Sequence, residues 1–371
     1  MKRRIPLFAT IAVLAAGLSA FGLSHARRGT AGKAVVLPDV PRNGGAATIL
    51  PNGWQITPAG TSIALPGDLP LKMTVSADDK FLLVNTGGYH DHSVSVLDLT
   101  TKKLAQSLNV GKTWAGMCLN RANGDLYLSG GGAPEAGFLK DAAKMGAGAS
   151  LLESFHHPIE RLSFHEGKLD WQTPLDIPGL SEQTGKGIKR ERYIAGLDWG
   201  KNGFLYAVNT QNDTVYKINP QTDAVDASTV VGYRPYAAAL SPDGAFLAVS
   251  NWGGQSVSLL NAQSMKETAR IPVGSQPNEL VWGKDGRLFV ANAGSNSVSV
   301  IHGGKVVETI KTSLSPADPV GSTPDALALS PDGARLYVAN AGNNDVAVID
   351  TSDPKESDVL GFIPTGWYPS A

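Results

Sequence analysis

The sequence predicts an all-β fold, a β-propeller of four-stranded blades, because one strand motif recurs along the chain at a nearly constant spacing. The motif is a five-residue apolar segment that ends on asparagine. Four clear copies end at Asn209, Asn251, Asn292 and Asn340, which lie 42, 41 and 48 residues apart. A period of about 40–45 residues is typical of propeller blades, which need neighbours to bury their faces.

Two earlier copies extend the pattern toward the N-terminus. Residues 81–85, Phe-Leu-Leu-Val-Asn, form a fifth copy. Residues 126–130, Leu-Tyr-Leu-Ser-Gly, form a sixth, in which glycine replaces the asparagine. From Gly130 to Asn209 the distance is 79 residues, so this repeat carries a long insertion.

Each copy lies in the same frame of turns and strands. A tight Asn-Gly or Asp-Gly turn precedes most copies, and such turns supply the positive φ angles of a hairpin. These turns fall at residues 123–124, 202–203, 243–244, 285–286 and 332–333. A strand of alternating character begins six residues after the asparagine, as at 215–218 and 346–348, and a further strand follows it. Four short strands per unit are what a propeller blade requires.

The two ends of the repeat region bear on the number of blades. Residues 53–59 and 61–65 are predicted to be two further strands, and residues 366–371 repeat the linker that opens a blade at Gly232. We therefore expect a seven-bladed propeller whose last blade is incomplete, in a chain truncated at its C-terminus. A six-bladed ring, with residues 53–65 paired elsewhere, is the alternative.

The N-terminus has the pattern of a secretory signal peptide. A basic start is followed by an apolar run over residues 5–23, and Ser24 and Ala26 supply small side chains before a cleavage site. The run also reaches the lower length limit of a membrane anchor, which is the alternative. We expect a signal peptide at 1–26, a linker at 27–53 and the propeller at 54–371. The mature protein would be periplasmic or secreted, without an integral membrane segment.

The repeat motifs carry a family resemblance. The asparagine-terminated strands, the Ser-Pro-Asp-Gly turns and the Val-Gly-x-x-Pro linkers resemble those of the YVTN-repeat β-propellers. Residues 50–54 (Leu-Pro-Asn-Gly-Trp), 252–254 (Trp-Gly-Gly) and 361–369 resemble the N-terminal propeller of exported proteins that continue into a phosphoesterase domain. The resemblance implies a propeller and is unspecific for function. Nothing in the sequence matches the second domain.

Composition excludes several classes of function. Lys and Arg number 32 against 33 Asp and Glu, and loss of residues 1–26 would leave a net charge near −4, so no nucleic-acid partner is expected. A single cysteine excludes an internal disulfide and a multi-cysteine zinc site. Nucleophile elbows, zinc-protease motifs, phosphate loops and dinucleotide fingerprints are all missing. No cofactor is predicted, and a non-catalytic role is favoured.

Strand alternation predicts which loops share a face. The linkers between blades and the loops after each asparagine should lie on one face, called here the linker face, and the Asp-Gly turns on the other, the turn face. The long insertions 130–158 and 180–192 belong to the linker face, and loops that depart from a repeat are where function usually lies. The predicted ligand-binding residues on this face are Tyr89, His90, Asp91, His92, Trp114, Arg234, Tyr236 and Trp252.

These residues leave two functions open. The aromatic side chains are suited to stacking, so the favoured role is a scaffold that binds a protein partner or a small ligand. His90 and His92 would point the same way in an extended segment, but no third ligand can be assigned, so no metal site is predicted. The alternative is a lactonase-like hydrolase, which requires titratable groups such as Asp325 to converge at the channel mouth. The oligomeric state stays open.

Overall fold

The computed structural model describes residues 48–49, 55–56, 58–88, 92–111, 113–130, 158–175, 193–315 and 317–371. All of them belong to one compact unit, Val40–Ala371. The predicted signal peptide and nearly all of the predicted linker lie outside the described residues.

Among the described residues, six antiparallel sheets of four strands each form most of this unit, and consecutive strands pair in sequence order. Blades 1 to 3 comprise β3 (Leu69–Val75), β4 (Phe81–Gly87), β5 (His92–Asp98) and β6 (Lys103–Gly111); β7 (Met117–Leu119), β8 (Asp125–Ser129), β9 (Ile159–His165) and β10 (Lys168–Trp171); and β11 (Ile194–Trp199), β12 (Leu205–Asn209), β13 (Thr214–Asn219) and β14 (Ala224–Val230). Blades 4 to 6 comprise β15 (Pro235–Leu240), β16 (Phe246–Asn251), β17 (Ser256–Asn261) and β18 (Glu267–Pro272); β19 (Pro277–Trp282), β20 (Leu288–Asn292), β21 (Ser297–His302) and β22 (Lys305–Lys311); and β23 (Pro324–Leu329), β24 (Arg335–Asn340), β25 (Asp345–Asp350) and β26 (Asp358–Pro364).

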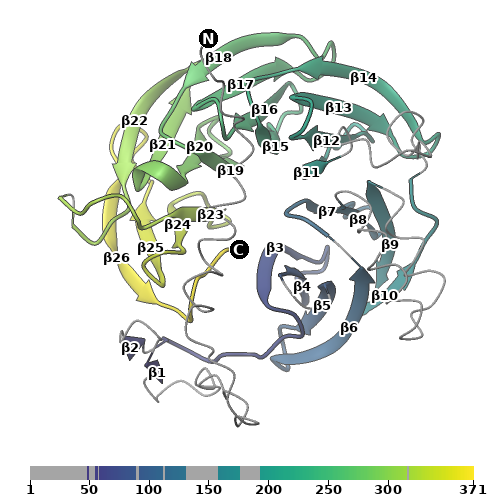
Figure 1. The fold of residues 1–371 in the computed structure, drawn as a ribbon, viewed down its shortest axis with the longest axis horizontal. Helices are drawn as coiled ribbons and strands as arrows, with labels where there is room; N and C mark the ends of the chain where they lie inside the picture. The colour runs from purple at the N-terminus through teal and green to yellow at the C-terminus, as the bar shows by residue number, and fades with distance from the viewer. Residues whose placement is uncertain are drawn as a thin grey trace, which may run out of the picture. The chain divides into compact units, whose positions relative to one another are not determined.

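The blades follow one another around a common axis, which confirms the β-propeller (Figure 1). The first strand of each blade is innermost, and the first strands of successive blades contact each other from β3 through to β23. Among the described residues the remaining elements are a short pair, β1 (Thr48–Ile49) with β2 (Gln55–Ile56), and one turn of 3₁₀-helix, η2 (Ala293–Ser295). No helix in this part of the chain is long and apolar enough to cross a bilayer.

The prediction of a seventh, incomplete blade is wrong, and the six-bladed alternative matches the structure. The predicted strand over residues 61–65 does not form, and among the described residues of the predicted strand 53–59, Gln55–Ile56 is extended and pairs with β1. Between blades 6 and 1 the chain runs without regular pairing. The N–H of Ala59 donates to the carbonyl of Pro364 (2.9 Å), and the hydroxyl of Ser370 donates to the carbonyl of Pro70 (2.6 Å).

The recurrent asparagine has a structural role inside the blade. Asn251 and Asn292 are fully buried, and each amide nitrogen donates to two serine hydroxyls of the following strand. The linker glycine packs against this side chain: a Cβ on Gly274 would lie 2.7 Å from the Asn292 amide. The repeat therefore keeps glycine and asparagine together for a close packing contact.

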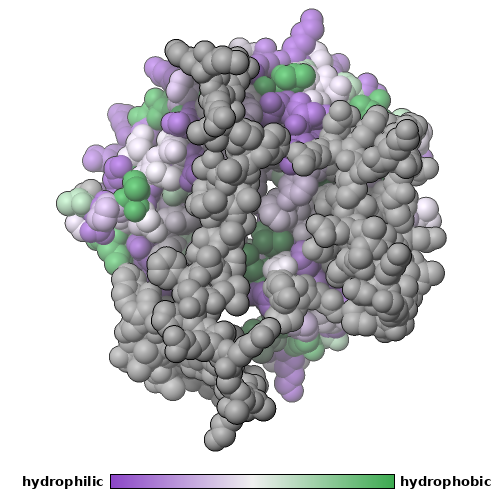
Figure 2. All heavy atoms as spheres, in the orientation of Figure 1, coloured by the Kyte–Doolittle hydropathy of each residue, from purple (hydrophilic) through white to green (hydrophobic). Residues whose placement is uncertain are grey.

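The apolar core lies between neighbouring blades rather than within one sheet. Between blades 2 and 3, Tyr127 stacks on Trp199 with ring centroids 5.5 Å apart and planes inclined by 5°. Between blades 3 and 4, the fully buried Tyr206 packs with Leu247 and Val249. On the visible rim, hydrophobic residues lie singly among hydrophilic ones (Figure 2), as expected for a surface whose apolar faces are covered.

The linker face and the turn face form as predicted. In blade 6 the loop after Asn340 bonds to the preceding linker, because the N–H of Ala341 donates to the carbonyl of Thr323 (2.9 Å). The long insertion starts and ends on the same face, where the N–H of Gly130 donates to the carbonyl of Pro158. The residues within the two insertions lie outside the described part of the chain.

Candidate functional site on the propeller axis

Irregularities in the innermost strands mark a candidate site. In five blades the pairing of the first strand with the second shifts register near its linker end, and in four of these the irregular stretch follows a proline. Proline cannot donate to the ladder, and a bulge re-aims the side chain that follows it. The freed N–H of Ala237 donates to the hydroxyl of Ser250 (3.0 Å) instead. Bulged residues Tyr236, Glu279 and Asp325 all carry functional groups.

An ion pair links two of these innermost strands. The ammonium of Lys72, on β3, lies 2.5 Å from a carboxylate oxygen of Glu279, on β19. These strands belong to blades 1 and 5, so the pair passes in front of the inner strand of blade 6. The side chains of Lys72 and Glu279 are 31% and 19% exposed, so solvent or a small molecule reaches both.

Two further carboxyls share the field of this lysine. Asp325, on β23, accepts a hydrogen bond from the amide of Asn278 (2.5 Å). Asp198, on β11, accepts from the N–H groups of Leu240 (2.6 Å) and Trp199 (2.9 Å). Lys72, Asp198, Glu279 and Asp325 are called here the axial cluster.

Burial and mutual repulsion perturb the two aspartates. Desolvation raises the pKa of Asp198 to about 6, and the Leu240 N–H and the Lys72 charge counteract this rise. Desolvation also raises the pKa of Asp325 to about 6; the charge of Glu279 adds to the rise, while Asn278 and Lys72 oppose it. Carboxyls with a pKa near 6 can take up and release protons close to neutral pH, as acid–base catalysts do.

Tyrosines border the cluster. Burial raises the pKa of Tyr236, and the charges of Asp325 and Glu279 add to this. Burial likewise raises the pKa of Tyr193, and the charge that Tyr236 would carry when ionised adds to this rise. Tyr193 also makes an edge-to-face contact with Trp114, with ring centroids 5.2 Å apart. The carboxyl-rich centre therefore has neutral aromatic hydroxyls beside it.

Of the five predicted site residues that the structure describes, Tyr236 alone borders the axial cluster. Trp114 is 38% exposed and joins the cluster indirectly, through Tyr193. Arg234 lies over the ring of Tyr233, 5.4 Å from its centroid. Trp252 is partly exposed in the loop after Asn251. Tyr89, His90 and Asp91 lie outside the described residues.

His92 is buried, and its ring is hydrogen-bonded within the protein rather than free to bind a ligand. Its side chain is 7% exposed, and its Nδ1 accepts a hydrogen bond from the N–H of Thr113 (3.0 Å). Its Nε2 lies 3.2 Å from the carbonyl of Gly88. Both ring nitrogens are thus occupied by the backbone, and His92 ties β5 to the linker into blade 2. No group of three or more His, Cys, Asp or Glu side chains suited to a metal ion occurs within the described ranges.

Sequence reasoning missed Lys72, Asp198 and Glu279. By strand register, Asp198 matches Ala239, Val281 and Ala328 of other inner strands. Glu279, just before Leu280, matches Ala237 and Ala326. A charged residue in an otherwise apolar inner strand was the available signal. Such a residue indicates a site only when the folded ring brings residues from distant blades together.

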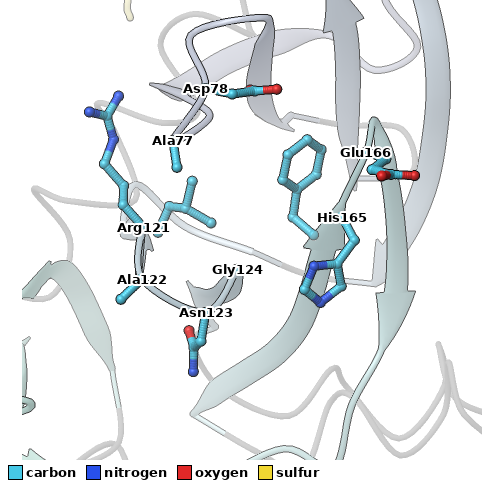
Figure 3. A pocket seen from close by; sticks show the side chains of 10 residues that line it. Ala77, Asp78, Arg121, Ala122, Asn123, Gly124, His165 and Glu166 are labelled. Carbon is cyan, nitrogen blue, oxygen red and sulfur yellow. The ribbon is translucent and has the colours of Figure 1, made fainter.

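The turn face carries pockets between blades. One cavity of about 390 Å³ lies between blades 1 and 2, and Figure 3 shows the side chains around it. Arg121 stands at one side, opposite His165 and Glu166. The Arg121 guanidinium is already engaged, because it donates to the carbonyls of Val75 and Ser76 at 3.1 and 3.2 Å.

Comparison with known proteins supports the fold. No protein-family model matches the chain, and no curated protein matches it. Among solved structures, the chain is similar to a Lactobacillus plantarum protein (TM-score 0.61, 14% identity, covering 87% of this chain and 92% of that one). It is also similar to a Bacteroides uniformis protein named putative 6-phosphogluconolactonase (0.59, 12%, 86% and 91%). A third similar structure is Kuenenia stuttgartiensis hydrazine synthase (0.58, 16%, 84% and 91%).

Fold and comparisons together define the class: a β-propeller protein with a charged cluster on its axis. At these levels of identity the likeness extends to the fold alone, because propellers serve many unrelated functions.

Proposed function

We propose that this protein is an exported β-propeller that binds a small polar ligand at the axial cluster. The observation that carries the proposal is the Lys72–Glu279 ion pair between blades 1 and 5, with Asp198 and Asp325 in the same electrostatic field. A simple ion pair needs only one carboxyl for each ammonium. Three carboxyls around one ammonium leave negative charge uncompensated, which is costly in a desolvated site.

The charge balance indicates the kind of ligand. A small molecule with an amino group would supply the missing positive charge to Asp198 or Asp325. The hydroxyl-bearing rings of Tyr193 and Tyr236 beside the cluster suit the apolar part and the polar substituents of such a molecule.

Thermal unfolding with a panel of small amines, amino acids and organic acids tests this proposal. An amine at about 100 times its Kd should stabilise the wild-type protein by about 2.7 kcal/mol. The variant Asp325→Asn should lose that shift, and Lys72→Ala should enlarge it because more negative charge is left uncompensated, whereas Asp332→Asn, at an exposed turn on the other face, should keep it. Stabilisation by no member of the panel, or an equal shift in Asp325→Asn, would contradict the proposal.

The linker face offers a surface for a larger partner. Tyr233, Trp367 and Val320 expose 53%, 63% and 71% of their surface there. These exposed apolar side chains suit contact with a protein partner, such as the phosphoesterase domain that follows the propellers that the sequence resembles. We propose that the linker face is where a protein partner contacts the ring, with the axial cluster beneath it.

Export belongs to the proposal and rests on the signal-peptide pattern of residues 1–26. N-terminal sequencing of the protein recovered outside the cytoplasm tests it. A start at Arg27 is expected, and an intact Met1 in that fraction would contradict cleavage.

A lactonase-like hydrolase is the second candidate. Two carboxyls with a pKa of about 6 beside a lysine favour it, since a general base and a cationic group can act together on an ester carbonyl. The Bacteroides uniformis neighbour's name points to the same class of substrate. Hydrolysis of a δ-lactone should rise with pH through about 6 and be lost in Asp325→Asn but not in Asp332→Asn. Equal rates in both variants would exclude this candidate.

A further inference from the structure

A pocket between blades 4 and 5, on the turn face, is independent of the axial cluster. It has a volume of about 480 Å³, within the range of small-molecule sites. Its wall is mostly apolar and includes two aromatic rings, those of Phe246 at the start of β16 and Trp282 at the end of β19. Leu259, on β17, and Ile301, on β21, complete the apolar lining. The two blades lie side by side around the ring (Figure 1).

Next to this pocket the repeat lacks its usual aromatic residue. Three positions before the asparagine, or before Gly130 in blade 2, four of the six blades carry an aromatic ring. The residues at this position in blades 1 to 6 are Leu82, Tyr127, Tyr206, Ala248, Phe289 and Tyr337. Tyr127, Tyr206 and Phe289 are buried, so their rings fill the space between blades. In blade 4 the residue is Ala248, which is fully buried and carries no ring, and its cross-strand partner Leu259 lines the pocket.

The opposite wall shows what the missing ring would contact. Trp199 and Trp282 hold the same position in blades 3 and 5, each paired with the first leucine of the next strand. Trp199 stacks on Tyr127 of the preceding blade. Ala248 holds, relative to Trp282, the position that Tyr127 holds relative to Trp199. The indole of Trp282 is held by a hydrogen bond from its Nε1 to the carbonyl of Ala239 (3.0 Å), so it forms a fixed wall.

A second difference keeps the pocket open. In blade 3, Phe204 is covered by the ammonium of Lys217, which lies 4.1 Å from the ring centroid. The equivalent pair in blade 4 is Phe246 and Leu259, by strand register. Phe246 is 38% exposed, and no cation lies over its ring among the residues that the structure describes.

Several polar groups of the lining already have hydrogen-bond partners within the protein. The hydroxyl of Ser241 donates to Asp243, and that of Thr268 donates to the carbonyl of Leu259. The Lys284 ammonium donates to the carbonyl of Pro331, toward blade 6.

His302 differs from these groups. Its Nδ1 makes a long hydrogen bond, 3.4 Å, to the carbonyl of Gly286. Nδ1 must carry the proton in that bond, so the Nε2 of the neutral ring is an acceptor. No partner for Nε2 occurs among the residues that the structure describes.

We propose that this pocket binds a small phenol. The aromatic ring takes the place of the tyrosine that other blades carry, packing between Trp282 and Phe246, and the hydroxyl donates to Nε2 of His302. The fold already makes such a contact with its own side chain, in the Tyr127–Trp199 stack.

Titration with 2-naphthol and 2-methoxynaphthalene, followed by fluorescence or calorimetry, tests the proposal on the full chain. The two probes share their rings, but only the naphthol can donate a hydrogen bond. Wild-type protein should bind one equivalent of each, with 2-naphthol tighter by about fivefold. His302→Ala should bring the two affinities together.

Substitutions in the wall test the location. Phe246→Lys should weaken both probes by more than about tenfold, because it places a charge in the apolar wall. Val307→Lys, at a 47% exposed position of β22 outside the lining, is the matched control and should bind normally. If Phe246→Lys fails to fold, Thr268→Arg at the exposed rim should block the pocket in its place. The proposal is overturned if wild-type protein binds neither probe, if Phe246→Lys binds both unchanged, or if the preference for the naphthol persists in His302→Ala.

Discussion

Lys72 and Glu279 lie 207 residues apart in sequence, yet their charged groups are 2.5 Å apart in the folded ring. Neither residue belongs to the repeat motif. Their contact depends on the six blades being in place, so it reports both on the closure of the propeller and on the site that closure creates.

The two axial aspartates should make stability depend on pH. Burial raises the pKa of Asp198 and of Asp325 from 3.8 to about 6, so the folded protein binds more protons than the unfolded chain between about pH 4 and 6. Stability should therefore fall as pH rises through this window, by on the order of 2 kcal/mol per group. Urea unfolding at pH 4.5 and pH 7 measures the difference.

The double variant Asp198→Asn/Asp325→Asn should have a smaller pH dependence in this window. Asp243→Asn is the matched control: the hydroxyl of Ser241 lowers the pKa of Asp243, so that group stays ionised from pH 4.5 to 7. An unchanged slope in the double variant would show that the aspartates titrate normally.

Glu160, on β9, should affect stability more strongly than either aspartate, and at higher pH. Its side chain is 2% exposed, its Oε1 has no partner in the part of the chain that the structure describes, and burial raises its pKa to about 8. Glu160→Gln should remove the cost of ionising this group and stabilise the protein by on the order of 3 kcal/mol above pH 8, with little effect at pH 5. Thermal unfolding at the two pH values tests this, and a stabilisation equal at both would contradict it.

The packing of linker glycine on repeat asparagine predicts a large effect of a small substitution. Gly274→Ala would place a Cβ 2.7 Å from the buried Asn292 side chain, so it should lower the free energy of unfolding by about 1–3 kcal/mol. Gly366→Ala is the control, because nothing lies within 4 Å of the added Cβ. Equal stabilities of the two variants in urea would rule out the packing role.

Cys118 should be inert in the folded protein. It is 7% exposed, and burial raises the pKa of its thiol, so little thiolate is available. A thiol reagent such as iodoacetamide should label it only in denaturant. Rapid labelling under native conditions would mean that β7 opens readily.

The repeat made the blades predictable, because apolar strands, Asp-Gly turns and a period near 42 residues are local features. The number of blades was harder to predict from the sequence. Residues 61–65 have the composition of a strand but lie between Gly60 and Pro66 and find no partner strand. The axial cluster was unpredictable in another way: Lys72, Asp198 and Glu279 each look like single irregular residues until the ring brings them together. His92 was chosen for its chemistry, but the backbone of Thr113 and Gly88 occupies its ring nitrogens.

Carbon-13 NMR titration of the aspartate carboxyls tests the axial cluster most directly. Two aspartates should titrate near pH 6 in the wild-type protein, and Lys72→Ala should raise both apparent pKa values, because the lysine charge lowers each of them. If every aspartate titrates below pH 5, or if Lys72→Ala leaves the two values unchanged, the four groups do not meet on the axis and the proposed site does not exist.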